Sequence, residues 1–156
     1  MPLKLPRRFD LVICLEVAEH LPEQVADTLV ASLTAAGNCI LFSAAIPGQG
    51  GQQHQNEQWP QYWQSKFVKR GYEFSDVVRD KIWEREDIEW WYQQNAFLVR
   101  RSDKVGETIP LRRIVHPQLF EKTLSHYKSI TEGRAGLNSA LRIVGKAILT
   151  SIRIRR

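Results

Sequence analysis

The stretch from residue 9 to residue 45 constrains the fold most strongly, because its apolar pattern predicts strand, helix, strand. It opens with an apolar, β-branched run at 9–15, which is typical of a strand buried on both faces of a parallel sheet. From Pro22, apolar residues recur at helical spacing as far as Gly37, which suits the end of a helix. A second apolar run follows at 39–45. The stretch therefore predicts one βαβ unit with a right-handed crossover.

Polar side chains follow both of these predicted strands. Glu16, Glu19 and His20 come directly after the first strand. Ser43 ends the second, and a glycine-rich loop follows it at 46–58. In open α/β sheets, ligands bind beyond the carboxyl ends of the strands. We therefore expect the functional site here, with the loop as a wall of the substrate pocket or as a plain solvent loop.

The rest of the chain predicts further α/β structure in one three-layer arrangement. We expect strands near 9–15, 39–45, 72–78 and 95–101 and helices near 22–36 and 60–70. The aromatic cluster of Trp83, Trp90, Trp91 and Tyr92 could line a pocket, but capping of the sheet is favoured because large aromatic rings bury well.

A resemblance to a known family accompanies these patterns. From Phe9 the chain reads Phe-Asp-Leu-Val-Ile-Cys-Leu-Glu-Val-Ala-Glu-His-Leu, which closely resembles the fourth strand and following loop of class I S-adenosylmethionine-dependent methyltransferases. The resemblance covers roughly 9–101. It implies a partial doubly wound, Rossmann-like α/β sheet made of the family's strands four to seven. The last strand would be antiparallel and lie between its predecessor and the fifth.

The resemblance also implies a domain division and a truncated cofactor site. Residues 1–101 would form the carboxyl half of a methyltransferase domain, and residues 102–156 a basic helical extension. The family binds S-adenosylmethionine mainly through a glycine loop after its first strand and an acidic residue after its second. Only eight residues precede Phe9, and Gly48, Gly50 and Gly51 follow a late strand. We expect no tight cofactor binding by this chain alone.

Site residues follow from the same resemblance. Cys14, Leu15, Glu16 and Val17 would line the cofactor, while Glu19, His20 and His54 would act on the methyl acceptor. His20 could equally be a helix-start residue bonded to the backbone. The acceptor itself, whether a small molecule, a glycan or a lipid, is not indicated.

A metal-assisted variant of this chemistry is a less favoured alternative. Glu-x-x-Glu-His with a later histidine resembles methyltransferases of ubiquinone synthesis and of small-RNA ends, which hold acceptor hydroxyls through a divalent metal. The candidate ligands are Glu16, Glu19, His20 and His54, whose carboxylates and imidazoles suit Mg²⁺, Mn²⁺ or Zn²⁺. The pattern is also common in relatives with no known metal.

Charge is unevenly distributed along the chain. Residues 1–100 carry 10 Lys and Arg against 13 Asp and Glu, whereas residues 101–156 carry 12 against 4. The segment Leu137–Arg156 has one apolar face and no acidic residue, which is typical of a helix that binds a membrane surface. Packing on its own domain or on a neighbour is the other interpretation. Nucleic acid is disfavoured because no aromatic residue is interleaved with the basic ones.

Three further expectations complete the sequence-based description. The apolar strand Phe9–Leu15 would be a bare edge without the family's first strand, so self-association is expected unless the tail or a partner covers it. Cys14 and Cys39 would be reduced thiols in a protein that is cytoplasmic, with a location at the membrane periphery as the alternative. The alternatives to an enzyme are an inactive remnant and a non-enzymatic module acting through the basic tail.

Overall fold

The computed structural model describes residues 3, 5–103, 109 and 111–154, which form two compact units, residues 1–116 and 117–156. The strands are β1 (Val12–Leu15), β2 (Cys39–Ser43), β3 (Tyr72–Ser75) and β4 (Phe97–Arg101). The first unit contains the short 3-10 helices η1 (Ala18–His20) and η2 (Glu23–Val25) and the helices α1 (Ala26–Ala36), α2 (Pro60–Val68), α3 (Arg79–Ile82) and α4 (Trp90–Asn95). The second contains α5 (Pro117–Thr131) and α6 (Leu137–Ile154).

The four strands form one mixed sheet in the order β1-β2-β4-β3. β1 and β2 are parallel, as a βαβ unit requires, and β4 is antiparallel to both of its neighbours. The four strands predicted from sequence are therefore confirmed, and the last one lies between β2 and β3 as expected. β1 is shorter than predicted because Phe9 makes only an isolated bridge to Gly37 and the chain bends before Val12.

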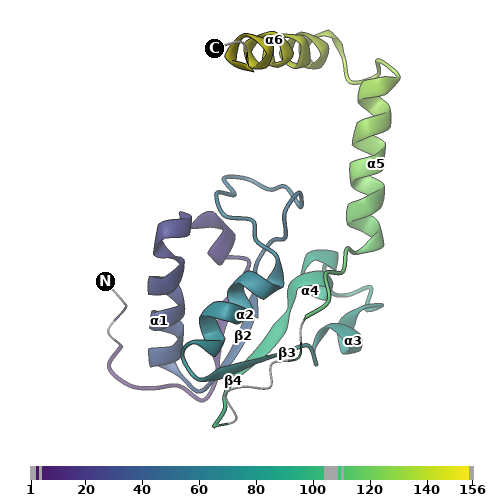
Figure 1. Cartoon of the computed structure of the whole chain (residues 1–156). Helices are drawn as coiled ribbons and strands as arrows, with labels where there is room; N and C mark the ends of the chain where they lie inside the picture. The colour runs from purple at the N-terminus through teal and green to yellow at the C-terminus, as the bar shows by residue number, and fades with distance from the viewer. Residues whose placement is uncertain (1–2, 4, 104–108, 110, 155–156) are drawn as a thin grey trace. The chain divides into compact units, whose positions relative to one another are not determined.

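One face of the sheet carries the core of the first unit. Phe42 at the centre of this face contacts the rings of Trp63 and Phe67 from α2, with ring centroids 5.4 and 5.3 Å apart. Val30 of α1 and Phe97 of β4 join the same buried cluster. The tilted and edge-on ring geometries are those that aromatic pairs prefer. Helices α1 and α2 thus form one layer against the sheet (Figure 1).

The opposite face of the sheet is only partly covered in the described residues. Ile13 is 62% exposed, and its neighbours in the register, Leu41 of β2 and Leu98 of β4, are half-buried. The predicted third layer is therefore missing over β1. Within the described chain β1 also pairs with β2 alone, so it forms an edge of the sheet.

The segment 111–116, which the sequence analysis assigned to the extension, packs in the first unit. Leu111 is buried, and its carbonyl accepts a hydrogen bond from Gln61 Nε2. His116 is buried beside Trp83, at 4.8 Å between ring centroids, and stacks on Trp90. These aromatic residues pack against the chain's own histidine, as expected of a capping cluster.

A fully buried guanidinium joins the strands to this segment. Arg79 pairs with Asp76 and lies over the ring of Phe97, 4.6 Å from its centroid. It also donates to the carbonyl oxygens of Gln94 and Arg112. The charge of the buried Arg79 side chain is thus compensated by a carboxylate, an aromatic ring and two carbonyl oxygens.

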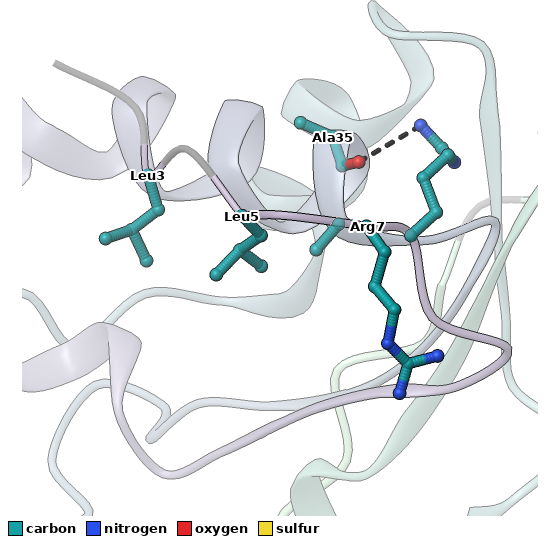
Figure 2. A pocket seen from close by; sticks show the side chains of 6 residues that line it. Leu3, Leu5, Arg7 and Ala35 are labelled. Carbon is teal, nitrogen blue, oxygen red and sulfur yellow. Dashed lines mark hydrogen bonds between the residues drawn. The ribbon is translucent and has the colours of Figure 1, made fainter.

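A pocket of about 440 Å³ lies between the amino-terminal segment and the end of α1. Its lining residues are Leu3, Leu5, Arg7, Arg8, Ala35 and Ala36, and Arg8 donates to the carbonyl of Ala35 (Figure 2). None of the predicted site residues lines this pocket.

We predict that the substitution Phe42→Ala lowers the free energy of unfolding of the first unit by roughly 3–5 kcal/mol, since it leaves a cavity among the three aromatic rings that Phe42 contacts. Phe120→Ala, at a residue of α5 that is 62% exposed, is the matched control and should have little effect. Urea unfolding followed by tryptophan fluorescence measures both, because all five tryptophans lie within residues 59–91. Equal losses for the two variants would contradict the assigned core.

We predict that the chain self-associates through the edge at β1 as its concentration rises into the micromolar range. Ile13→Lys should reduce this association, because a charge on an edge strand opposes strand pairing between chains. Val77→Lys, at another exposed apolar position outside the strands, should leave it unchanged. Light scattering of a monomer at every concentration would contradict this prediction.

Candidate functional site

The carboxyl ends of β1 and β2 lie side by side because the two strands are parallel and in register, Leu15 opposite Ser43. After β1 the chain turns into η1, and after β2 it forms the glycine-rich loop. The loop is fastened to η1 through the carbonyl of Glu19, which accepts from the backbone N–H groups of Gln55 at 2.8 Å and Asn56 at 3.0 Å. Residues 36 and 37 positions apart in sequence are thereby held together.

This fastening assembles three of the predicted site residues into one cluster. Glu19, His20 and His54 each offer a ligand atom, and these atoms all lie within 4.8 Å of one another. The rings of His20 and His54 meet edge to face, with centroids 4.9 Å apart and planes at 86°. One carboxylate and two imidazoles at this spacing could hold a divalent cation.

Glu19 has an unusual environment for a carboxylate. Its side chain is fully buried, and neither oxygen has a hydrogen-bond partner among the described residues. Burial raises the pKa of this carboxyl to about 7, and the charge of Glu16 acts in the same direction. A buried, unpaired carboxylate is costly, so its retention beside two imidazoles points to a ligand that compensates it.

The orientation of His54 is set by the glycine-rich loop. Nδ1 of His54 lies 2.9 Å from Oε1 of Glu57, whose carboxylate accepts from the N–H groups of Gly48 at 2.7 Å and Gly50 at 2.9 Å. Both glycines have positive φ, 84° and 69°, which turns their amides toward one point. Gly51 lies against the ring, where a Cβ would come within 2.3 Å of Nε2. A carboxylate bonded to a ring nitrogen is a usual partner of metal-binding histidines.

Glu16, the fourth metal candidate from sequence, is not brought into the cluster. Its carboxylate accepts hydrogen bonds from Gln49 Nε2 at 2.9 Å and Asn95 Nδ2 at 3.2 Å. Its backbone has a φ of 50°, in the left-handed region that is unfavourable for glutamate, and its N–H is held by the Oγ of Ser43 at 2.9 Å. Strain of this kind at the end of a strand is common at functional sites.

The residues predicted to line the cofactor are placed differently from one another. The side chain of Cys14 lies in the core, where burial, followed by the charge of Glu19, raises the pKa of the thiol to about 11. This thiol is free but not a nucleophile at neutral pH. Leu15 and Glu16 are half-buried, and Val17 is exposed. Only these last three could present side chains to a ligand at the strand end.

Sequence reasoning missed the residues that support this site. Glu57 lies three positions after His54 in the same glycine-rich loop. This short spacing could have indicated that Glu57 orients the His54 ring. Gln49 and Asn95 carry no such signal, because they meet Glu16 only through the fold.

No family model, no curated protein and no solved structure matches this chain. The arguments about function therefore depend on the residues, the fold and the stated resemblance.

We predict that Glu19 makes the chain less stable as the pH rises. Burial raises the pKa of this carboxyl in the folded state to about 7, whereas an unfolded glutamate has its ordinary pKa of 4.5. The stabilising contribution is present below the unfolded pKa and is lost as the pH rises through the folded one. Over this window the loss is roughly 3 kcal/mol, at about 1.4 kcal/mol per pKa unit.

The measurement is urea unfolding between pH 5 and 8 in the presence of a chelator. Glu19→Gln should remove this component of the pH dependence, while Glu23→Gln, at an exposed carboxyl nearby, should keep it. A Glu19→Gln variant with the unaltered pH dependence would show that the carboxyl is charged throughout.

Proposed function

We propose that this chain carries the acceptor-side half of an S-adenosylmethionine-dependent methyltransferase, and that Glu19, His20 and His54 hold a divalent metal ion at its acceptor site. The single observation that supports the site most strongly is the buried carboxylate of Glu19, unpaired among the described residues and facing two imidazoles. The mixed sheet, with its last strand antiparallel between two others, is compatible with the fold that the resemblance implies.

The donor set favours Mn²⁺ or Zn²⁺ over Mg²⁺. Two of the three donors are imidazole nitrogens, whereas Mg²⁺ prefers oxygen ligands. Such an ion would act as a Lewis acid, lowering the pKa of a bound hydroxyl and fixing its position. The residues fit this role, since neither carboxylate oxygen of Glu19 has a hydrogen-bond partner among the described residues and His54 is oriented by Glu57.

Methyl transfer from a sulfonium is an in-line displacement, so the protein mainly has to align the acceptor and remove its proton. Without a cation, burial raises the pKa of Glu19 to about 7, whereas a bound cation would hold this carboxylate in its charged form as a ligand. His20 is exposed and lies at the mouth of the cluster, where an acceptor would arrive.

The cofactor would approach the strand end formed by Leu15, Glu16 and Val17. Glu16 is not a free carboxylate there, because Gln49 and Asn95 already hold both of its oxygens. We therefore assign it to shaping the wall of the site through its fixed backbone, and we expect only weak cofactor binding by this wall alone.

The second candidate is a chain without catalysis, either a remnant or a binding module that acts through its basic tail. The charge excess of residues 101–156 favours it, but it gives no reason for the buried, unpaired carboxylate of Glu19.

One nuclear magnetic resonance experiment on the isotope-labelled chain tests both halves of the proposal. Paramagnetic Mn²⁺ should broaden the amide signals of residues 19, 20 and 54 at low stoichiometry, and Glu19→Gln should abolish this effect while Glu23→Gln retains it. S-adenosylhomocysteine at millimolar concentration should shift signals of residues 15–17, with no binding detectable at micromolar concentration.

The Mn²⁺ titration and the S-adenosylhomocysteine titration test the metal site and the cofactor wall independently. Broadening confined to exposed carboxylates elsewhere would remove the metal site but leave the cofactor wall. Absence of any shift at residues 15–17 up to the solubility limit of the ligand would remove the methyltransferase assignment. Low-micromolar binding would show that the cofactor contacts lie elsewhere in the chain.

A further inference from the structure

Helix α6 is strongly amphipathic and has an exposed apolar face. At about 100° per residue, its apolar residues Leu137, Leu141, Val144 and Ile148 fall within one narrow stripe along the helix. All four are exposed, and Leu137 reaches 74%. In a water-facing helix such a continuous stripe is unfavourable, so its presence marks an interaction surface.

The opposite side of α6 is basic. Arg142 and Lys146 lie across the helix from the apolar stripe, and Leu137–Arg156 contains five Lys or Arg residues and no Asp or Glu. Two further exposed apolar residues, Ile143 and Leu149, lie outside the stripe, and Leu149 is next to Arg142 around the helix. The helix thus combines a narrow apolar stripe with an opposite side whose charged residues are all positive.

The helix is suited to lying on a membrane rather than crossing one. Its 18 residues span about 27 Å, which would place several turns in the plane of a surface. Among the described residues, no helix has the length and apolar character needed to traverse a bilayer. Lys and Arg beside an apolar stripe can extend their charges toward lipid headgroups while the stripe enters the acyl region.

We propose that α6 binds the surface of an anionic lipid bilayer, with the stripe of Leu137, Leu141, Val144 and Ile148 inserted and Arg142 and Lys146 facing the headgroups. Charge complementarity selects this occupant. A second copy of α6 would bring two purely positive helices together, which like-charge repulsion opposes. Nucleic acid would contact the basic side and leave the apolar stripe in water.

This inference is independent of the proposed catalytic function, because it concerns only the second unit. The test is co-sedimentation of the full chain with vesicles of phosphatidylcholine and phosphatidylglycerol, compared with vesicles of phosphatidylcholine alone. We expect binding to the anionic vesicles, much weaker binding to the neutral ones, and a loss of affinity in high salt.

Two double variants separate the contributions of charge and apolar area. Arg142→Ala with Lys146→Ala should weaken vesicle binding about 30-fold, at about 1 kcal/mol per basic residue near an anionic surface. Leu141→Ser with Ile148→Ser should weaken it at least about tenfold, because two inserted side chains are lost. The matched controls are Lys69→Ala with Arg70→Ala and Val77→Ser, which alter exposed residues of the first unit.

Folding of each variant is checked by tryptophan fluorescence for the first unit and by far-ultraviolet circular dichroism for the helices. Equal binding to neutral and anionic vesicles would overturn the proposal, as would equal losses in the controls and the α6 variants. If vesicles are not bound and the Leu141→Ser with Ile148→Ser variant instead abolishes a dimer, the stripe is an interface between copies.

Discussion

The parallel pairing of β1 with β2 is the constraint on which the rest of the first unit depends. Only a parallel pair places both carboxyl ends at the same edge of the sheet, and the register sets Leu15 beside Ser43. From that edge two connections leave, η1 and the glycine-rich loop, and the carbonyl of Glu19 fastens one to the other. The cluster of Glu19, His20 and His54 is a result of this backbone arrangement.

The interior near the site is more polar than the core beneath it. Phe42, Trp63 and Phe67 fill the face against α2 with apolar contacts, while Gln49, Gln94 and Asn95 form a buried hydrogen-bonded network at the strand ends. Each amide in this network has a partner, as buried polar groups require. Among the described residues, Glu19 departs from this rule at both of its carboxylate oxygens, whereas other buried side chains such as Trp63 and Asn56 have a single unpaired atom.

The sequence predicted the fold better than it predicted the site. The strands were predictable because apolar, β-branched runs dominate their own conformation, and the helix after Pro60 because its stripe and its terminal Gly71 are local signals. The third layer was not predictable, since cover for the face around Ile13 depends on contacts that no local pattern specifies. His20 and His54 could be named from a motif, but the bond from Asn95 to Glu16 joins residues 79 positions apart and could not.

The loop around Glu57 has a further consequence. Converging glycine amides of this kind normally form a nest for an external anion such as phosphate. Here the nest is filled from within, because the Glu57 carboxylate takes the amides of Gly48 and Gly50. The glycine amides are therefore already satisfied within the chain, and an external anion would have to displace the Glu57 carboxylate to reach them. A side chain of the loop itself thus takes the place that an anionic ligand would occupy.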